Sequence, residues 1–118
     1  MRHRVKKVKI GANKEHTVSM MRNLAMAVLI HERVETTSKR ANAVVPFIER
    51  LISIGKSRDK MNAIRQIEKL LQHENSSRKI LEELVKRYET RSSGFTRMHK
   101  IGSRKGDNAP LVQIELLP

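Results

Sequence analysis

The chain lacks cysteine and tryptophan, and it contains only one tyrosine and two phenylalanines among its 118 residues. The absence of cysteine excludes a disulfide scaffold, a cysteine-ligated zinc site and a thiol nucleophile. Because aromatic residues are so few, the core has to be built from Leu, Ile, Val, Met and Ala, a composition that suits helices. A chain of this length forms one domain and leaves little room for an enzyme with a deep cleft.

Long apolar stretches are also missing. The longest, residues 25–30, is far too short for a membrane span or a signal sequence, and Met1 is followed at once by basic residues. We therefore expect an intracellular, soluble protein from which no targeting segment has been removed. The absence of a presequence favours a bacterial over an organellar origin.

The chain has an excess of positive charge, with 25 Lys and Arg residues against 12 Asp and Glu, a net charge of +13. So much charge of one sign repels itself in a compact body unless a polyanion neutralises it. Residues 1–31 carry +6, residues 32–90 carry +4 and residues 91–118 carry +3. The two flanks are basic with few acids among them, which predicts two contact regions for nucleic acid on one body.

Four stretches have apolar residues three and four positions apart, as one face of a helix requires. The candidate N-caps of these helices are Thr17, then Thr37 or Ser38, then Asp59, and finally Ser76 or Ser77. The side chains expected to face inward are Met61, Ile64, Ile67, Leu70 and Leu71 in the third helix and Ile80, Leu81, Leu84, Val85 and Tyr88 in the fourth. Pro46 lies inside the second helix, residues 38–55, and predicts a bend or a break there.

Three stretches have the pattern of strands. Residues 33–37 are rich in β-branched side chains and fit an edge strand, and residues 95–101 show a weak alternation of apolar and polar side chains. A clearer alternation places Val112, Ile114 and Leu116 on the inner face of the last strand. A basic, glycine-bearing loop joins the last two strands into an extended hairpin.

The sequence offers little for catalysis. The five histidines have no helical spacing that would bring two onto one face, and although His31 and Glu32 open like a zincin motif, position 35 is Glu and not a second histidine. The loop between Gly102 and Gly106 lacks Walker spacing, and no glycine-flanked serine forms a nucleophile elbow. We expect no metal, no cofactor, no small-molecule substrate and no enzymatic activity.

The basic flanks are suited to neutralising phosphates. The chain has no trusted helix-turn-helix signature and no aromatic pair of the kind that stacks on RNA bases. Phe95 is the only exposed candidate for stacking, whereas Phe47 and Tyr88 lie on apolar helical faces. An architectural binder of folded RNA fits best, and a nucleoid-type DNA-binding protein or a small histidine-dependent hydrolase are the alternatives.

Particular residues also resemble a known family. They are Arg2-His3-Arg4, Arg22-Asn23, His31-Glu32 and Thr36-Thr37, and above all Gly94-Phe95-Thr96-Arg97, Gly106-Asp107-Asn108-Ala109-Pro110 and Ile114-Glu115-Leu116. In this order and at this spacing they resemble the bacterial large-subunit ribosomal protein seventeen family (bacterial L seventeen). The resemblance covers nearly the whole chain, and its specific elements are GFTR and GDNAP.

The resemblance implies an α+β domain, residues 16–118, with four to five helices on a small sheet of about three strands, preceded by an extended basic N-terminal arm, residues 1–15. It also implies a cytoplasmic structural constituent of the large ribosomal subunit, bound to large-subunit ribosomal RNA beside other ribosomal proteins, near the nascent-chain exit region and away from membranes. The expected RNA-binding residues are Arg2, His3, Arg4, Lys6, Lys7, Lys9, Lys14, His16, Arg22, Lys39, Arg40, Arg97, Lys100, Arg104 and Lys105. Asp107 and Asn108 are better interpreted as turn-formers.

Overall fold

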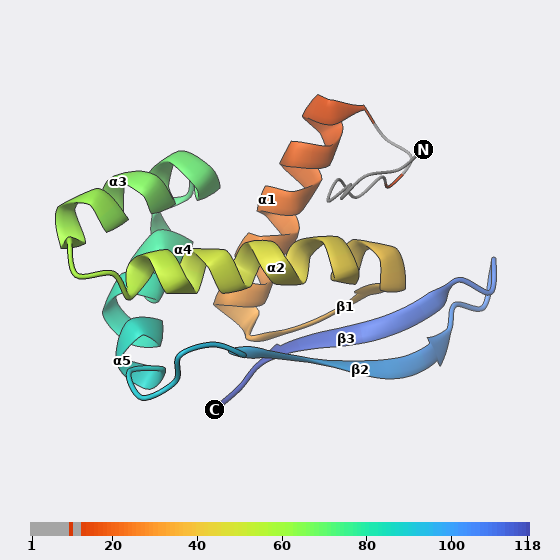
Figure 1. The fold of residues 1–118 in the computed structure, drawn as a ribbon. Helices are drawn as coiled ribbons and strands as arrows, with labels where there is room; N and C mark the ends of the chain where they lie inside the picture. Colours follow the sequence, from red (N-terminus) through yellow and green to blue (C-terminus); the bar gives the residue numbers. More distant parts are fainter. Residues whose placement is uncertain (1–9, 11–12) are drawn as a thin grey trace, which may run out of the picture.

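The protein is an α+β fold in which helices pack on one face of a small antiparallel sheet (Figure 1). The computed structural model describes residue 10 and residues 13–118. In chain order its elements are α1 (Lys14–His31), β1 (Arg33–Thr37), α2 (Ser38–Gly55), α3 (Lys60–Leu71), α4 (Glu74–Lys79), η1 (Ile80–Leu84), α5 (Val85–Arg87), β2 (Thr96–Ser103) and β3 (Pro110–Leu116). Segments α4, η1 and α5 form one continuous helix with a π turn, η1, at its centre. The predicted class, helices packed on a three-stranded sheet, is confirmed.

Helix α1 begins earlier than its apolar pattern predicts. Asn13 is the N-cap, and its side chain accepts a hydrogen bond from the backbone N–H of His16 at 2.8 Å. Thr17, the predicted cap, already lies in the helix, where its N–H donates to the Asn13 carbonyl at 2.9 Å. The prediction was wrong because a polar first turn adds nothing to the apolar pattern, and asparagine caps a helix at least as well as threonine. Residues 14 and 15 of the predicted arm are therefore helical.

Helix α2 follows β1 directly, with Thr37 as its N-cap, as predicted. It runs without interruption from Ser38 to Gly55, so the break considered at Pro46 does not occur. A proline in a helix interior costs about 3 kcal/mol because it removes one hydrogen bond and crowds the preceding turn. Apolar burial on both sides of the proline outweighs that cost. The buried residues of α2 are Ala41, Ala43, Val44, Ile48, Leu51, Ile52 and Gly55.

Helix α3 is capped by Asp59, as predicted, whose carboxylate accepts from the Asn62 N–H at 3.2 Å. Its buried stripe differs from the predicted one, because Met61 is 60% exposed and Ile64 is 36% exposed. The residues that face the core are Ala63, Ile67 and Leu71, four positions apart. A small alanine at the contact lets the helix lie close to its neighbours, and this choice of face rotates the two larger side chains outward.

The last helix starts at Glu74 with His73 as its N-cap, so the caps predicted at Ser76 or Ser77 were wrong. The His73 ring nitrogen Nδ1 accepts from the Ser76 N–H at 3.2 Å. Both serine side chains are buried in the first turn, and their hydroxyls donate to the His73 carbonyl. The helical conformation is therefore interrupted between α3 and α4 at Gln72, which has a left-handed φ of 55°.

The sheet has the strand order β1-β3-β2, and β3 is antiparallel to both neighbours. β1 is an edge strand, as predicted, and β2 and β3 form the predicted hairpin. Val112, Ile114 and Leu116 are buried on the inner face, as their alternation predicts. Helices α1 and α2 cover this face (Figure 1). Among the described residues, no helix has the length and apolarity needed to span a bilayer.

The segment before β2 closes the core with an aromatic pair. Phe95 is fully buried, so its predicted exposure was wrong, and its ring lies 5.0 Å from that of Tyr88. The Tyr88 hydroxyl donates to the Leu117 carbonyl at 2.6 Å. The Glu49 carboxylate accepts from the backbone N–H groups of Phe95 and Thr96, at 2.9 and 3.0 Å, and from the Thr96 hydroxyl. These bonds fix the start of β2 to α2 and carry the ring inward.

We expect Gly55→Ala to lower the free energy of unfolding by up to about 2 kcal/mol, because overpacking costs about 1–3 kcal/mol and the better helix propensity of alanine returns about 1 kcal/mol. A Cβ at this position would lie 2.9 Å from Ile80 Cγ2 and 3.2 Å from Val85 Cγ2, atoms on stiff β-branched side chains. Urea unfolding followed by circular dichroism measures the loss. Gly106→Ala is the control, because a Cβ there meets nothing within 4 Å. Equal losses in the two variants would contradict the prediction.

Candidate nucleic-acid interface

The predicted interface is only partly within the structure. Its N-terminal members, Arg2, His3, Arg4, Lys6, Lys7 and Lys9, lie outside the described residues. The others lie on α1, at the start of α2 and on the β2–β3 hairpin. Each of these places has its own geometry.

An open groove of about 590 Å³ brings two of the predicted residues together. His16 of α1 and Arg40 of α2 both line it, with Ser19, Met20, Asn23, Leu24, Ala27 and Thr36. Lys14 and Lys39, which neighbour the two lining residues in sequence, are exposed. Among the described residues, no carboxylate lies within ion-pair distance of Lys14, Lys39 or Arg40. The groove and its surroundings therefore combine polar donors with unneutralised positive charge.

Arg22 is engaged inside the protein. Its Nε donates to the Leu70 carbonyl at 2.8 Å, and its Nη1 donates to Gln72 Oε1 at 3.4 Å. The first bond satisfies a carbonyl in the last turn of α3, where the helix itself provides no donor. Arg22 thus joins α1 to the end of α3. Its side chain serves the packing of the helices, whereas the groove residues are exposed to a partner.

The hairpin does not bring its predicted residues onto one face. Arg97 lies opposite Glu115 in the β2–β3 register, whereas Lys100 lies opposite Val112. Directly opposed residues share a face of the sheet, and Val112 is buried on the helix side. Lys100 therefore points to the helix side of the hairpin and Arg97 to the open side.

On the open face of the sheet, Glu115 is surrounded by cations. Arg33 lies 3.3 Å from its carboxylate, Arg97 lies 3.7 Å away, and His99 Nε2 lies 2.9 Å away. The hydrogen bond from His99, with the positive charges of Arg33 and Arg97, lowers the pKa of the Glu115 carboxyl. Sequence reasoning identified Arg97 but missed Arg33 and His99, because only the strand register places them beside this carboxylate.

The loop at the hairpin tip is closed by an ion pair. Arg104 Nε and Nη2 donate to the Asp107 carboxylate at 2.9 and 2.6 Å. These bonds, with one from the Ala109 N–H, lower the pKa of Asp107 to about 2. Asn108 adopts a left-handed φ of 56°. Asp107 and Asn108 are turn-formers, as predicted, and Lys105, also at the tip, has no ion pair in the part of the chain that the structure describes.

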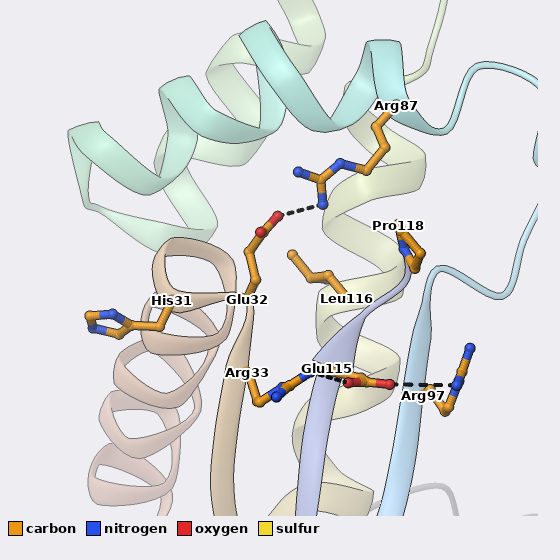
Figure 2. A pocket seen from close by; sticks show the side chains of 8 residues that line it. All are labelled: His31, Glu32, Arg33, Arg87, Arg97, Glu115, Leu116 and Pro118. Atoms are coloured by element: carbon orange, nitrogen blue, oxygen red, sulfur yellow. Dashed lines mark hydrogen bonds and ion pairs between the residues drawn. The ribbon is translucent and has the colours of Figure 1, made fainter.

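A second open cavity, of about 860 Å³, lies where the end of α1, the sheet and α5 meet (Figure 2). It is lined by His31, Glu32, Arg33, Arg87, Arg97, Glu115, Leu116 and Pro118. Inside it, Arg87 pairs with Glu32, and Arg33 and Arg97 pair with Glu115, while the His31 ring points away from both groups (Figure 2). Carboxylates neutralise these guanidinium groups, so the ion pairs in this cavity join α1, the sheet and the last helix. We call this set of contacts the joint.

Glu32 is the centre of that joint. It is the C-cap of α1 with a left-handed φ of 64°, and its carbonyl accepts from the Leu116 N–H at 2.9 Å. Its carboxylate pairs with Lys79 and Arg87. Desolvation raises the pKa of this carboxyl, but the hydrogen bond from Arg87 and the charges of Lys79 and Arg87 outweigh it, and the net pKa is lowered. The residue connects α1, β3 and the last helix.

The cations of the described residues fall into two groups. Six Lys and Arg residues form ion pairs, namely Arg33, Arg78, Lys79, Arg87, Arg97 and Arg104. The exposed ones without a carboxylate within 4.0 Å include Lys14, Lys39, Arg40, Lys100 and Lys105, which were predicted, and Arg58, Arg65 and Lys69, which were not. Residues 1–12 contain no acidic side chain, so they supply no carboxylate to these cations.

Comparison with known proteins gives consistent matches along the chain. Residues 20–117 match the family model of Ribosomal protein L17. The chain is 40% identical to the large ribosomal subunit protein bL17 of Syntrophotalea carbinolica, over 99% of this chain and 75% of the relative. It is 38% identical to that of Wolbachia pipientis subsp. Culex pipiens, over 99% and 83%, and 36% identical to that of Neorickettsia sennetsu, over 99% and 100%.

Replacing Glu32 by Gln should lower the free energy of unfolding by about 1–2 kcal/mol, because it removes the carboxylate that pairs with two mostly buried cations and leaves Arg87 with Glu83 alone. The side chains of Lys79 and Arg87 are only 17% and 22% exposed. Urea unfolding measures the loss. Glu89→Gln is the control, since Glu89 is exposed and has no ion pair among the described residues. If both variants unfolded at the same urea concentration, the ion pairs of Glu32 would not contribute to stability as predicted.

An NMR titration of the Asp107 carboxyl should give a pKa of about 2 in the unaltered protein and a higher value, closer to the ordinary 3.8, in Arg104→Ala, where the bond from the Ala109 N–H remains. Since the folded-state pKa is depressed, the loop closure that this ion pair provides is fully present above about pH 4 and is lost as the pH falls through about 2. The backbone amides of the hairpin tip report that loss. An unchanged pKa in the variant would contradict the assigned cause.

Proposed function

The chain belongs to the ribosomal protein L17 family, and from that membership we propose how it acts. It is a structural constituent of the large ribosomal subunit, which in bacteria is cytoplasmic, and it is not an enzyme. We propose that it binds and stabilises large-subunit ribosomal RNA through two basic surfaces. The arm–groove surface consists of the basic arm residues with Lys14, His16, Lys39 and Arg40. The hairpin surface consists of Arg97, Lys100, Arg104 and Lys105, which lie on the two faces and at the tip of the hairpin.

The observation that carries this proposal is the set of exposed cations that have no carboxylate partner among residues 13–118. Arg40 lines the groove, Lys39 precedes it in α2, and Lys100 and Lys105 lie on the hairpin. A cation with no partner inside the molecule is free to neutralise an RNA phosphate, and each such contact releases counterions. Arg104 contributes less charge because Asp107 pairs with it, although a guanidinium has further N–H donors to offer.

The aromatic residues support a mode of binding that depends on charge and shape. Tyr88 and Phe95 are fully buried, and Phe47 is partly buried against the core. These are all the aromatic side chains of the chain. Base stacking of the kind used by RNA-recognition sheets is therefore not available to it. Phosphates and the overall form of folded RNA are what its surfaces suit.

The place of the chain within the subunit is part of the same proposal. Family membership supports a position near the nascent-chain exit region, beside other ribosomal proteins. In that position the protein brings together RNA helices whose phosphates would otherwise repel one another. The groove and the hairpin provide the positive charge for this at separate points of the fold.

Binding to purified large-subunit ribosomal RNA tests the proposal. Lys39→Gln/Arg40→Gln should make the plot of log affinity against log salt less steep by about 1.5, since each phosphate contact contributes about 0.7–0.9 to the slope. Arg78→Gln/Lys86→Gln removes the same charge from helix positions outside both surfaces and should leave the slope unchanged. Deletion of residues 1–12 should weaken binding while circular dichroism shows an intact fold.

Sedimentation of a cell lysate through a sucrose gradient tests the same proposal in the cell. The unaltered protein should co-sediment with the large subunit at moderate salt. A pool that stays with the chromosome would instead support a nucleoid-type DNA-binding protein. In the RNA-binding measurement, equal salt slopes for Lys39→Gln/Arg40→Gln and Arg78→Gln/Lys86→Gln would contradict the assignment of Lys39 and Arg40 to the interface. They would not contradict ribosomal RNA as the partner.

A further inference from the structure

The positive charge of the chain's middle lies in one segment. Residues 50–69 contain six basic and two acidic side chains, whereas residues 32–49 and residues 70–90 each contain equal numbers of the two. The whole +4 of residues 32–90 therefore belongs to the end of α2, the connection to α3, and α3 itself. Neither the arm–groove surface nor the hairpin surface includes any of these residues.

Three of these cations form what we call the α3 surface, namely Arg58, Arg65 and Lys69. All three are exposed, and in residues 13–118 their side chains have no hydrogen bond or ion pair. Arg65 and Lys69 lie one turn apart, about 6 Å along the helix, on the side away from the buried stripe. By contrast, Lys56 donates to the Arg91 carbonyl and Lys60 donates to the Gly55 carbonyl, so these two serve the fold.

The α3 surface differs from an ordinary solvated helix face. The last helix of this chain has opposite charges four positions apart, Arg78 with Glu82 and Glu83 with Arg87. Arg65 and Lys69 are like charges at that same spacing, which destabilises an isolated helix by about 0.2–0.5 kcal/mol. An external anion lying along this face would convert the repulsion into attraction.

The α3 surface is also far from the hairpin. Figure 1 shows α3 at one end of the molecule and the β2–β3 loop at the other, and the longest dimension of the protein is 44 Å. The α3 surface and the hairpin surface can therefore contact different parts of a large partner.

We propose that the α3 surface binds the phosphate backbone of a second segment of ribosomal RNA, separate from the segment at the hairpin, so that the chain bridges the two. This inference rests on the proposed function for the identity of the polyanion. Gln66 and Asn62, exposed between the cations, add neutral hydrogen-bonding groups that suit a regular phosphate backbone, while the exposed carboxylates Asp59 and Glu68 leave the segment of residues 50–69 with an excess of four positive charges.

Site-directed cross-linking tests the bridge. A photoreactive residue is placed at Gln66, on α3, or at Ser103, at the end of β2, and each protein is assembled into the large subunit before irradiation. Both positions are exposed, and neither belongs to the cations assigned to a surface. We expect both to cross-link ribosomal RNA, at nucleotides in different segments. Cross-linking of Gln66 to protein alone, to nothing, or to the nucleotides reached from Ser103 would overturn the bridge.

Binding to purified large-subunit ribosomal RNA provides the second measurement. Arg65→Gln/Lys69→Gln should reduce the salt slope by about 1.5, while Arg78→Gln/Lys86→Gln, also two exposed helical cations, leaves it unchanged. Glutamine keeps the helix propensity of both positions. If the unaltered protein binds no ribosomal RNA and Ser103 captures none, the proposed function fails. If it binds but the α3 variant behaves like the control, only the bridge fails.

Discussion

Twelve carboxylates serve a chain with 25 Lys and Arg residues, and the fold places several of them where segments have to be joined. Glu32 connects the end of α1 to the last helix, and Glu49 holds the start of β2 on α2. Glu115 lies under cations from both edge strands, and Asp107 closes the hairpin tip. Because the acidic groups are few and several are used at these joints, exposed cations such as Lys39, Lys100 and Lys105 have no carboxylate partner among the described residues. The internal order of the fold and its attraction for a polyanion thus have a common electrostatic origin.

Much of the fold could be predicted from periodicity alone. The alternation in β3, the β-branched edge strand and the Asp59 cap all follow from the side chains of neighbouring residues. The errors arose where a residue's role depends on distant contacts. Met61 and Ile64 match a helical apolar pattern, but the core accepts the smaller Ala63 instead. Phe95 is buried at a place fixed by the hydrogen bonds that its backbone N–H donates to Glu49. Local patterns do not contain that information.

The candidate interface was predictable in kind and less so in arrangement. Residue type and net charge indicate phosphate binding, but they do not say which cations are already neutralised. Arg104 and Arg22 are held by partners within the chain, and the strand register separates Arg97 from Lys100. The α3 surface was missed because counting residues 32–90 together averages a basic segment with two neutral ones. The ion pairs of the folded protein show which cations are neutralised, and the net charge of a long segment does not.

The π turn at Ile80–Leu84 makes the contacts beyond it depend on chain length as well as side-chain identity. A π turn holds one more residue than an α-helical turn, and each helical residue advances the side chains by about 100°. Removing one residue here would rotate Arg87 away from Glu32 and Tyr88 away from Phe95 together. An insertion or deletion between His73 and Tyr88 would therefore change which residues Arg87 and Tyr88 contact. The spacing itself is a structural constraint, comparable to that on any single residue in the core.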